Sequence, residues 1–543
     1  MYKRQFPFFN IGNPNKTGLT VESVMRRSNP YGKMARRSIG AVGQTDSCKE
    51  IHGKYGLERA LDSLLYGTPG LAKKIPLTKD IVSWTDVEPV AGYSVRTTID
   101  IQLQDIVETE LNRVLDSCSA DWGCAVLMDV KTGDIKAISN LERSKSGKYI
   151  EALNYAVVGF EPGSVVKPIS MMIALEDGLV NNLEEVIPIG KSWAYAGGRP
   201  ITDSHFNASL RVREVIEQSS NIGMARIITR GYDKNPKGFV ERLRGIGFLD
   251  PMNTGISGEL TPYFNPNPAR VDLSRMCYGY ASRIPPIYTL SVYNAIANGG
   301  RYVRPRLVKG LHKENFDSIL PVTYIRDRIC SEENARKMQY MLKQVVWGSH
   351  GTGRSLKNER VPLAGKTGTC YSVDPGTGRY NTAKKRLAFC GFFPADDPQY
   401  SCIVLTFWPK RNMFGAASTS GQVMKNIAVK MHSRGLLGNS PDYAAEAVGA
   451  SRAQLYGSLQ PDRHGKVRRA TGMTSEAHPA TPRKMPQGTV PSVLGLGLRE
   501  ALVALENDGF NVKFDGTGYV RSQTPSEGTP LKPGSTIHLA LAP

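Results

Sequence analysis

The sequence predicts an α/β protein of several domains, whose largest part is an antiparallel sheet with a lobe of helices inserted in sequence. Two observations predict it. Strand, helix, strand and strand patterns follow one another from about residue 93 to 140, a run of helical patterns comes next, and strands resume at 361–408. A polar stretch at about 441–486 then separates off a compact pattern of one helix and three strands.

The elements follow from their periodicities. Residues 93–98 alternate as a strand, and the next helix has an apolar face made of Leu103, Ile106, Val107, Leu111 and Leu115. Two strands flank the turn residues KTGD at 131–134. We expect helices at 164–180, 211–232, 237–247 and 287–298, and late strands at 361–374, 387–393 and 400–408. Strands on both sides of these helices fit an antiparallel sheet with the helical lobe between them.

Composition divides the chain into four parts. Residues 1–85 are basic and irregular, with one short helix and too little apolar material for a core, so we expect them to pack on another part. Residues 86–440 hold the sheet and the lobe, and residues 441–486 read as a basic linker. Residues 487–543 form a small α+β module. The helix of this module presents one apolar face, made of Leu498, Ala501, Leu502 and Leu505.

The charge of the chain points to anionic partners. Its 69 Lys and Arg outnumber 49 Asp and Glu, which gives a net charge of +20. Such a field favours nucleic acid, acidic lipid or a cell-wall polymer. Because the sequence contains no motif that reads RNA or DNA and no zinc-finger spacing, nucleic acid is not an expected partner.

The cysteines give further expectations. The eight cysteines form no CxxC pair and lie near no histidine cluster, so we expect no metal site and interpret most of them as small buried apolar residues. Cys390 and Cys402 flank an expected hairpin turn and could face one another.

No apolar run approaches the roughly 18 residues of a membrane span. The irregular opening MYKRQ suggests a gene truncated at its 5′ end, with an anchor helix missing.

The stretch EPGSVVKP at 161–168 raises the question of a nucleophile. Lys167 follows Ser164 by three positions, which places the amine and the hydroxyl on one helix face. The alternative is a serine that only caps a buried helix, with Pro168 in its first turn. Ser164 begins the only Ser-x-x-Lys of the chain, but this pattern alone has little specificity.

Two further motifs follow in order. SSN at 219–221 lies at the edge of the expected helical lobe, and KTGT at 366–369 lies on an expected strand. A second KTG at 131–133 lacks the flanking glycine, and we assign it only a hairpin turn. Ser-x-x-Lys, Ser-x-Asn and Lys-Thr-Gly in this order are the signature of the acyl-serine, penicillin-recognising enzymes.

With these motifs the chain resembles class B penicillin-binding proteins, the peptidoglycan D,D-transpeptidases. Over roughly residues 85–430, the segments TTIDIQLQ, NAIANGGRYVRP and LAFCGFFPADDPQY resemble further landmarks of that family. The resemblance implies the penicillin-binding/β-lactamase-like transpeptidase fold, with residues 1–85 as the remnant of a pedestal (dimerisation) domain. Residues 487–543 resemble a PASTA domain, which favours the division-specific branch over the elongation branch.

The resemblance implies a catalytic role for four residues. Ser164 would attack the carbonyl of a D-alanyl-D-alanine peptide, with neutral Lys167 as its base. Burial and repulsion from Lys366 would lower the pKa of Lys167 and keep it neutral. Ser219 would relay the proton to the leaving amine, and Asn221 would hold Lys167 and the substrate amide.

The third motif would bind the substrate. Lys366, Thr367, Gly368 and Thr369 are the implied substrate-binding residues, with Lys366 and Thr369 on the terminal carboxylate. The backbone N–H groups of Ser164 and Thr369 would form the oxyanion hole. A peptide could lie against this strand as an added strand. No metal or cofactor is required.

The resemblance also implies partners and a location. The implied partners are peptidoglycan stem peptides, lipid-linked precursor strands, β-lactam antibiotics, a SEDS-family glycosyltransferase and other divisome proteins. The implied location is the periplasm, with the chain anchored in the inner membrane. Three alternatives stay open. A β-lactamase would need a carboxylate that activates water, for which Glu259 is the nearest candidate in sequence. The others are a D,D-carboxypeptidase, and a β-lactam sensor or catalytically idle scaffold that adheres to an anionic wall.

Overall fold

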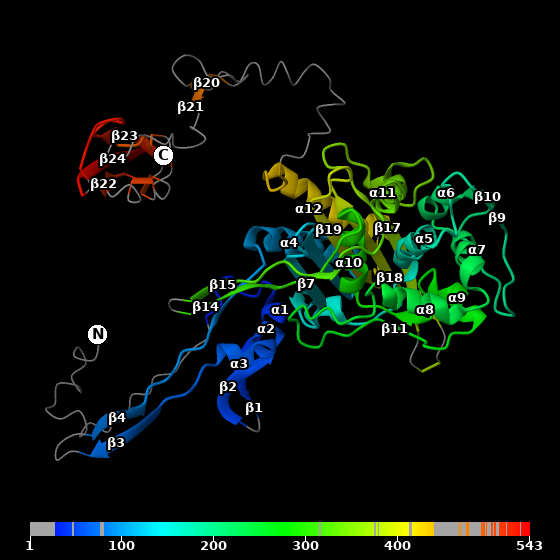
Figure 1. Cartoon of the computed structure of the whole chain (residues 1–543), viewed down its shortest axis with the longest axis horizontal. Helices are drawn as coiled ribbons and strands as arrows, with labels where there is room; N and C mark the ends of the chain where they lie inside the picture. Colours follow the sequence, from blue (N-terminus) through cyan, green and yellow to red (C-terminus); the bar gives the residue numbers. More distant parts are fainter. Residues whose placement is uncertain are drawn as a thin grey trace. The chain divides into compact units, whose positions relative to one another are not determined.

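The computed structural model describes residues 28–45, 48–76, 81–313, 316–373, 376–377, 380–411 and 415–438, and short stretches between 466 and 542. The chain divides into two compact units, residues 1–443 and 444–543. Figure 1 shows the elements of both units, coloured along the sequence.

The larger unit is built on a six-stranded antiparallel sheet, as the sequence predicts. Its strands stand in the order β17-β18-β19-β6-β7-β8, and every neighbouring pair is antiparallel. The early strands therefore join the late ones at β6 and β19, and β17 forms one edge. The bounds are Trp122–Asp129 (β6), Ile135–Arg143 (β7), Tyr149–Glu151 (β8), Ala364–Val373 (β17), Tyr380–Phe393 (β18) and Tyr400–Phe407 (β19).

Helices cover both faces of this sheet. Successive side chains of a strand point to opposite faces, and both faces of these strands are apolar. Ala125 and Leu127 pack in an apolar cluster with α4 and α12, whereas Cys124 and Val126 join a larger cluster with α5, α10 and α11. The residues of α10 are all buried, which fits its apolar sequence. The five helices are α4 (Ile101–Cys118), α5 (Lys167–Glu176), α10 (Pro286–Ala297), α11 (Glu332–Trp347) and α12 (Gln422–Ser433).

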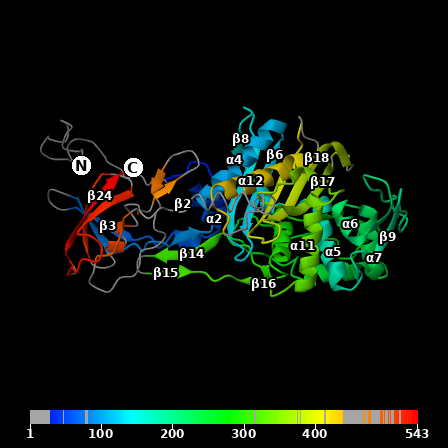
Figure 2. The same cartoon turned by 90° about the horizontal axis from the view of Figure 1, so that it is seen from above.

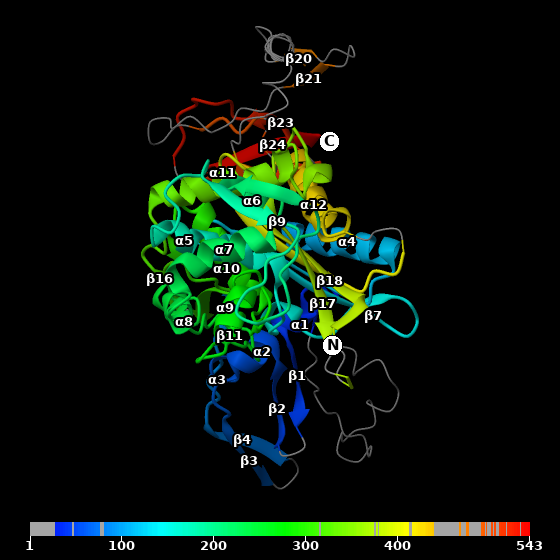
Figure 3. The same cartoon turned by 90° about the vertical axis from the view of Figure 1, so that its right-hand side faces the viewer.

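The helices differ from their prediction at SSN, and α11 and α12 were not predicted. Two helices, α6 (Val212–Glu217) and α7 (Asn221–Tyr232), replace the single helix expected over 211–232, and the break falls inside SSN. Ser219 has a left-handed backbone with φ of 61°, and Ser220 is extended, so neither residue continues a helix. In Figures 1 and 2, α5, α6 and α7 gather on one side of the unit, and Figure 3 looks onto that side.

The lobe and the loops around it contain shorter elements. They are α8 (Pro236–Gly245), α9 (Arg270–Met276), β9 (Val186–Gly190), β10 (Asn207–Arg211), β11 (Tyr263–Phe264), β12 (Ser282–Arg283), β13 (Tyr302–Val303) and β16 (Tyr324–Arg326). Pairs of these strands form small antiparallel ladders.

The N-terminal region packs on the rest of the larger unit, as expected for a segment without a core of its own. Leu57 is buried in the same apolar cluster as α5, and the backbone N–H of Gly56 donates to Ser257 Oγ at 3.2 Å. The elements are α1 (Arg36–Ile39), β1 (Ala41–Thr45), β2 (Cys48–Tyr55), α2 (Gly56–Ala60), α3 (Asp62–Leu65), β3 (Leu71–Pro76), β4 (Ile81–Val87) and β5 (Ser94–Thr97). Strand β5 pairs with β14 (Val308–Lys313), which pairs on its other side with β15 (Phe316–Ile319).

The second unit has a three-stranded sheet in the order β22-β24-β23. The strands are β22 (Asn511–Asp515), β23 (Tyr519–Thr524) and β24 (Thr536–Ala542), close to the three strands expected. Ala501 and Leu505 of the predicted helix are buried in its core, whereas Leu498 lies outside the described residues. The stretch expected to be a linker contains a short hairpin of β20 (Lys466–Arg468) and β21 (Thr474–Glu476).

The cysteines behave as small apolar residues, but one expectation about them is wrong. Cys390 stands opposite Ile403 and Cys402 opposite Gly391, so the two side chains point to opposite faces of the sheet rather than towards each other. All seven cysteines whose side chains are described are buried and free. Among the helices that the structure describes, none is long and apolar enough to cross a membrane.

Candidate active site

Ser164 lies in a tight turn immediately before α5. Residues Gly163–Val166 form a 3₁₀ turn, and the α-helix begins at Lys167 without a side-chain cap. Ser164 therefore does not act as a helix cap, contrary to the simpler of the two sequence interpretations. Its side chain is partly exposed, which leaves the hydroxyl free for chemistry.

Two glycines let this turn touch strand β17. A Cβ on Gly163 would lie 2.9 Å from the carbonyl oxygen of Thr369, and Gly163 has a positive φ of 62°. A Cβ on Gly368 would lie 2.9 Å from Cγ1 of Val165. Side chains at either position would push the serine turn away from the strand, so the third motif positions the first through its lack of a side chain.

Lys167 is a buried amine that contacts the second motif. Its side chain is fully buried, and Nζ donates to the carbonyl oxygen of Ser219 at 2.5 Å and to Ser219 Oγ at 3.1 Å. Burial lowers the pKa of Lys167 to about 7, against the opposing attraction of Asp203 and Cys277. The amine is therefore poised between its charged and neutral forms near neutral pH.

The backbone of the SSN turn explains this contact. Because Ser219 adopts the left-handed conformation, the chain leaves α6 and enters α7 through a sharp turn beside Lys167. The Ser220 hydroxyl accepts from the N–H of Gly223 at 2.8 Å, which makes Ser220 the N-cap of α7. Asn221 Nδ2 donates to the carbonyl oxygen of Thr202 at 2.9 Å, and the described residues show no hydrogen bond from it to Lys167.

Asp203 is a component of the site that the sequence motifs do not contain. Its carboxylate accepts hydrogen bonds from Ser220 Oγ at 2.5 Å, from the N–H of Asn221 at 2.6 Å and from the N–H of Ile222 at 3.2 Å. The carboxylate thus ties the SSN turn to the loop before β10 and stabilises the start of α7. No spacing rule links Asp203 to SSN, because the contact crosses from one loop to another.

The third motif lies on the edge strand β17. Lys366 is fully buried, and its Nζ donates to the carbonyl oxygen of Thr367 at 3.0 Å. The hydroxyls of Thr367 and Thr352 lie 2.7 Å apart, so Thr352 is a second contact that the motifs did not reveal. Gly368 is buried and Thr369 exposed. Among the described strands only β18 pairs with β17, which leaves the other edge for a peptide.

Both lysines of the site have lowered pKa values. Burial and the nearby charge of Lys167 lower the pKa of Lys366 well below its ordinary value. Burial is the largest cause of the lowered pKa of Lys167.

Three further features of the sequence have structural roles. The second KTG, at 131–133, forms the turn between β6 and β7 as expected, with Gly133 at a φ of 69°. Cys370 is buried, and burial beside Glu161 raises the pKa of its thiol to about 12, so the thiol stays protonated. The Glu259 carboxylate accepts from Thr254 N at 2.9 Å and from Thr254 Oγ1 at 2.6 Å, which commits it to its own loop.

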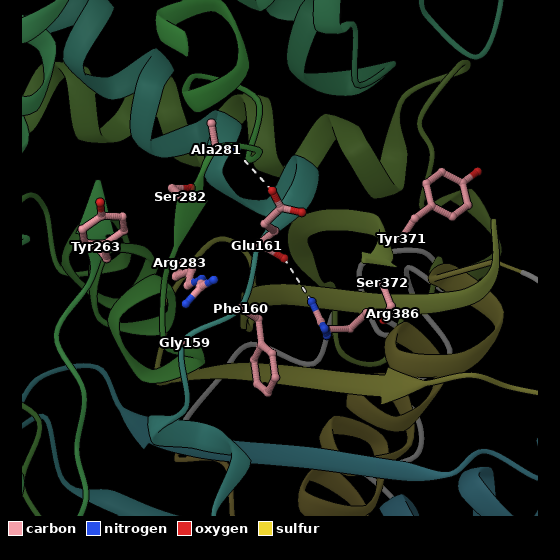
Figure 4. Close-up of a pocket in the computed structure, with 10 residues that line it drawn as sticks. All are labelled: Gly159, Phe160, Glu161, Tyr263, Ala281, Ser282, Arg283, Tyr371, Ser372 and Arg386. Carbon is pink, nitrogen blue, oxygen red and sulfur yellow. Dashed lines mark hydrogen bonds between the residues drawn. The ribbon is translucent and has the colours of Figure 1, made fainter. Parts of the chain in front are cut away.

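A pocket of about 630 Å³ adjoins the serine turn and the end of β17 (Figure 4). Glu161 stands in the middle of the view, where its carboxylate accepts from the N–H of Ala281 at 3.2 Å and its carbonyl oxygen from Arg386 Nη1 at 3.4 Å. The residues that line the pocket are Gly159, Phe160, Glu161, Tyr263, Ala281, Ser282, Arg283, Tyr371, Ser372 and Arg386.

Comparison with known proteins gives matches for both units. Residues 123–429 match the family described as penicillin binding protein transpeptidase domain, and residues 488–543 match the PASTA domain. The first match contains all three motifs.

Named relatives and a solved structure agree with these matches. Penicillin-binding protein PbpB of Mycolicibacterium smegmatis is 29% identical over 77% of this chain and 66% of its own length. Peptidoglycan D,D-transpeptidase FtsI of Escherichia coli K12 is 28% identical over 76% of this chain and 67% of its own. The crystal structure of penicillin binding protein 3 of Mycobacterium tuberculosis with aztreonam superposes with a TM-score of 0.65 and 25% identity, over 77% of this chain and 92% of that one. The chain thus spans about two thirds of the curated relatives.

Proposed function

The chain belongs to the penicillin-binding protein transpeptidase family, and on that basis we propose that it is a peptidoglycan D,D-transpeptidase that works through an acyl-Ser164 intermediate. The observation that carries the proposal is the buried amine of Lys167, one turn from Ser164 and bonded to Ser219, with a pKa of about 7. An exposed lysine is charged near pH 7, whereas a lysine that acts as a general base must be neutral.

In the acylation step, Ser164 Oγ attacks the carbonyl between the last two D-alanines. The hydroxyl proton passes to the neutral amine of Lys167, and the carbonyl oxygen takes the negative charge between the N–H groups of Ser164 and Thr369. When the C–N bond breaks, Lys167 returns the proton through Ser219 to the leaving D-alanine amine. The product is an ester between Ser164 and the rest of the stem peptide.

Substrate binding uses β17. The terminal carboxylate lies against Lys366, Thr367 and Thr369, while the peptide adds along the open edge of the strand with Gly368 allowing close approach. The amide of Asn221 faces the substrate amide once the peptide displaces its bond to Thr202. A β-lactam occupies the same position and acylates Ser164 when its ring opens.

The second half-reaction forms the cross-link. An amine of a neighbouring stem peptide attacks the ester carbonyl, gives its proton to Lys167, and releases Ser164 as a hydroxyl. If water attacks instead, the product is a free carboxylate, as in a D,D-carboxypeptidase. The two reactions are distinguished by their products when an amine acceptor is present: a transpeptidase forms the amide, and a carboxypeptidase forms the free acid.

The cellular setting is proposed from the relatives and the tail. Relatives named FtsI and PbpB, together with the PASTA match, support a role in septal cell-wall synthesis during division. This role places the catalytic domain in the periplasm, anchored in the inner membrane, next to a SEDS-family glycosyltransferase and other divisome proteins. Its substrates are stem peptides on lipid-linked precursor strands.

The test of the acyl-serine chemistry is covalent labelling. Incubation with a fluorescent penicillin should add one acyl group to the intact mass, and Ser164→Ala should abolish the adduct. Lys366→Ala should slow labelling strongly, whereas Lys131→Ala, the matched lysine of the turn KTG, should label like the parent. A parent protein without a stable adduct, or an undiminished adduct in Ser164→Ala, would overturn the proposal. Rapid hydrolysis of the penicillin would favour a β-lactamase. Labelling by penicillin, without release of D-alanine from a peptide substrate, would favour a sensor.

A further inference from the structure

A hollow of about 390 Å³ lies at the C-terminal end of α10, where this helix meets the turn between β6 and β7, strand β16 and the start of α11. Its volume is that of a site for a small ligand. The polar side chains of its lining come from Lys131, Asn298, Arg301, Tyr324, Arg328 and Glu332. We call it the α10 hollow.

The α10 hollow is separate from the catalytic site. No residue of the three motifs lines it. Phe160, near the serine turn, forms a backbone bridge with Ile284 just before α10, so the catalytic site adjoins the N-terminal end of this helix. The 12 residues of α10 span about 18 Å. A ligand in the hollow, at the other end of the helix, does not touch Ser164.

One wall of the α10 hollow is the tight turn at residues 298–300. Gly299 and Gly300 have positive φ angles of 66° and 92°. A Cβ on Gly300 would lie 2.3 Å from the carbonyl oxygen of Cys330, and the N–H of Ile329 donates to Gly300 O at 2.9 Å. The turn is thus packed against the segment that leads into α11, so this wall is a fixed part of the fold.

The α10 hollow carries an excess of positive charge. Its lining contains three cations, Lys131, Arg301 and Arg328, and one carboxylate, that of Glu332, which leaves an excess of two charges. Lys131 and Arg301 form no ion pair with any described residue. The Glu332 carboxylate lies 2.8 Å from Nη2 of Arg336 and 3.9 Å from Nη2 of Arg328. A concave surface of this charge attracts a doubly charged anion.

Asn298 adds a hydrogen-bond donor without a partner. The residue lines the hollow and is only 8% exposed. Its Oδ1 accepts from Lys131 Nζ at 3.4 Å, whereas its Nδ2 donates to no residue that the structure describes. Buried polar groups are nearly always paired, so a free donor at this wall calls for an acceptor in the hollow.

Protein contacts hold both arginines at the α10 hollow. The guanidinium carbon of Arg301 lies 5.2 Å from the centroid of the Tyr324 ring, and Arg328 Nη1 donates to Gly299 O at 2.7 Å. A guanidinium group has five N–H donors, so each arginine keeps donors for a ligand. Phosphate oxygens accept from both guanidinium and ammonium groups. A phosphate monoester has close to two negative charges near neutral pH, which matches the excess of the lining, whereas a carboxylate has only one.

We propose that the α10 hollow binds a doubly charged oxyanion of the phosphate class, a phosphate monoester or a diphosphate. Lys131, Arg301 and Arg328 supply the charge, and Asn298 Nδ2 supplies a neutral hydrogen bond. The inference does not depend on the proposed transpeptidase function. It gives a defined position to one of the anionic partners that the net charge of +20 favours.

The experiment titrates the full chain with inorganic pyrophosphate in a calorimeter at physiological ionic strength. The parent should show saturable binding that acetate does not compete away. Lys131→Gln and Arg301→Gln should each weaken binding about tenfold, as expected for the loss of one charge-assisted hydrogen bond. Asn298→Asp, which replaces the free donor by an acceptor, should abolish binding. Lys145→Gln is the matched control: it removes an exposed lysine from the turn between β7 and β8, changes the net charge equally, and should bind like the parent.

Vesicles identify the source of the phosphate group. The full chain is sedimented with phosphatidylcholine vesicles that contain or lack phosphatidic acid. Sedimentation that requires phosphatidic acid and is lost in the Lys131→Gln, Arg301→Gln double variant would support the site with a lipid headgroup as its ligand. Pyrophosphate binding without such sedimentation would support it with a soluble phosphate compound.

Penicillin labelling checks that the variants fold. Each should label with benzylpenicillin like the parent, because the α10 hollow contains no motif residue. Two results would overturn the site: no saturable binding of pyrophosphate by protein that labels, or equal weakening in Lys145→Gln and Lys131→Gln, which would reduce the effect to net charge. A parent protein that binds pyrophosphate but does not label would overturn only the acyl-serine function.

Discussion

The amine of Lys167 lies 2.5 Å from the carbonyl oxygen of Ser219, a residue whose backbone is held in the left-handed conformation. The first two motifs thus meet through main chain as well as side chain. Because Ser219 Oγ is also within 3.1 Å, one buried amine connects the proposed nucleophile turn to the proposed proton relay. The chemistry of the site therefore depends on the protonation of Lys167.

Acylation should rise with pH through a single step near 7. The base acts only when neutral, and burial lowers the pKa of Lys167 to about 7 from the ordinary 10.5. At a pH one unit below this pKa only about a tenth of the amine is neutral, and above it the rate should level off. The measurement is the second-order rate constant for penicillin labelling between pH 5 and 9. A rate that still rises steeply between pH 8 and 9 would indicate a lysine with an ordinary pKa.

Asp203→Asn should move that step to lower pH. The carboxylate attracts the charged form of Lys167 and so raises its pKa, and the amide removes this attraction. Asp203→Ala should in addition loosen the turn, because Ser220, Asn221 and Ile222 lose their acceptor, at about 1–2 kcal/mol of unfolding free energy. Labelling profiles and thermal unfolding distinguish the two variants. An unchanged pH profile in Asp203→Asn would assign Asp203 a purely structural role.

Binding of a terminal carboxylate should draw a proton onto the protein. Burial and Lys167 lower the pKa of Lys366, and a carboxylate beside the amine raises it again. Calorimetry of Ser164→Ala with a D-alanyl-D-alanine peptide, in buffers of different ionisation enthalpy, measures this uptake at neutral pH. An observed enthalpy that is independent of the buffer would contradict it.

Gly368→Ala should slow acylation more than tenfold. The new Cβ would lie 2.9 Å from Val165 Cγ1, so the turn of Ser164 must move or the strand must shift, at about 1–3 kcal/mol. Gly245→Ala is the matched control, since no atom lies within 4 Å of its new Cβ and its φ is not positive. Penicillin labelling of both variants tests the prediction, and equal rates would mean that the contact does not position Ser164.

Sequence periodicity predicted five of the six strands of the sheet and helices α4, α5, α8 and α10, because their apolar patterns are local, whereas α9, α11 and α12 were not predicted. The strands from Trp122 to Arg143 and from Tyr380 to Phe407 contain runs of apolar residues that are nearly all buried, because helices cover both faces of the sheet. The break at 218–220 was missed, since a left-handed serine has no signature of its own and the flanking helices share one apolar pattern.

The sequence predicted that three motifs belong to one candidate site, but it did not predict the contacts between them. The three motifs mark Ser164, Lys167, Ser219 and the residues of β17, and the structure brings them together. Asp203 and Thr352 were not predicted, because each touches a motif across a loop connection that no spacing rule describes. The face on which Cys390 and Cys402 lie depends on a register offset of one residue, which the sequence of a hairpin does not fix.

The contact between the serine turn and Gly368 joins segments that lie about 200 residues apart in the sequence. The N–H of Thr369 comes near Ser164 only after β17 has paired with β18 and the sheet has closed through β19 and β6. Under the proposed function, reactivity towards penicillin requires these long-range pairings. An acylated molecule reports that the whole domain has reached its native topology, which makes labelling a measure of the folded fraction in mixtures where helix content would mislead.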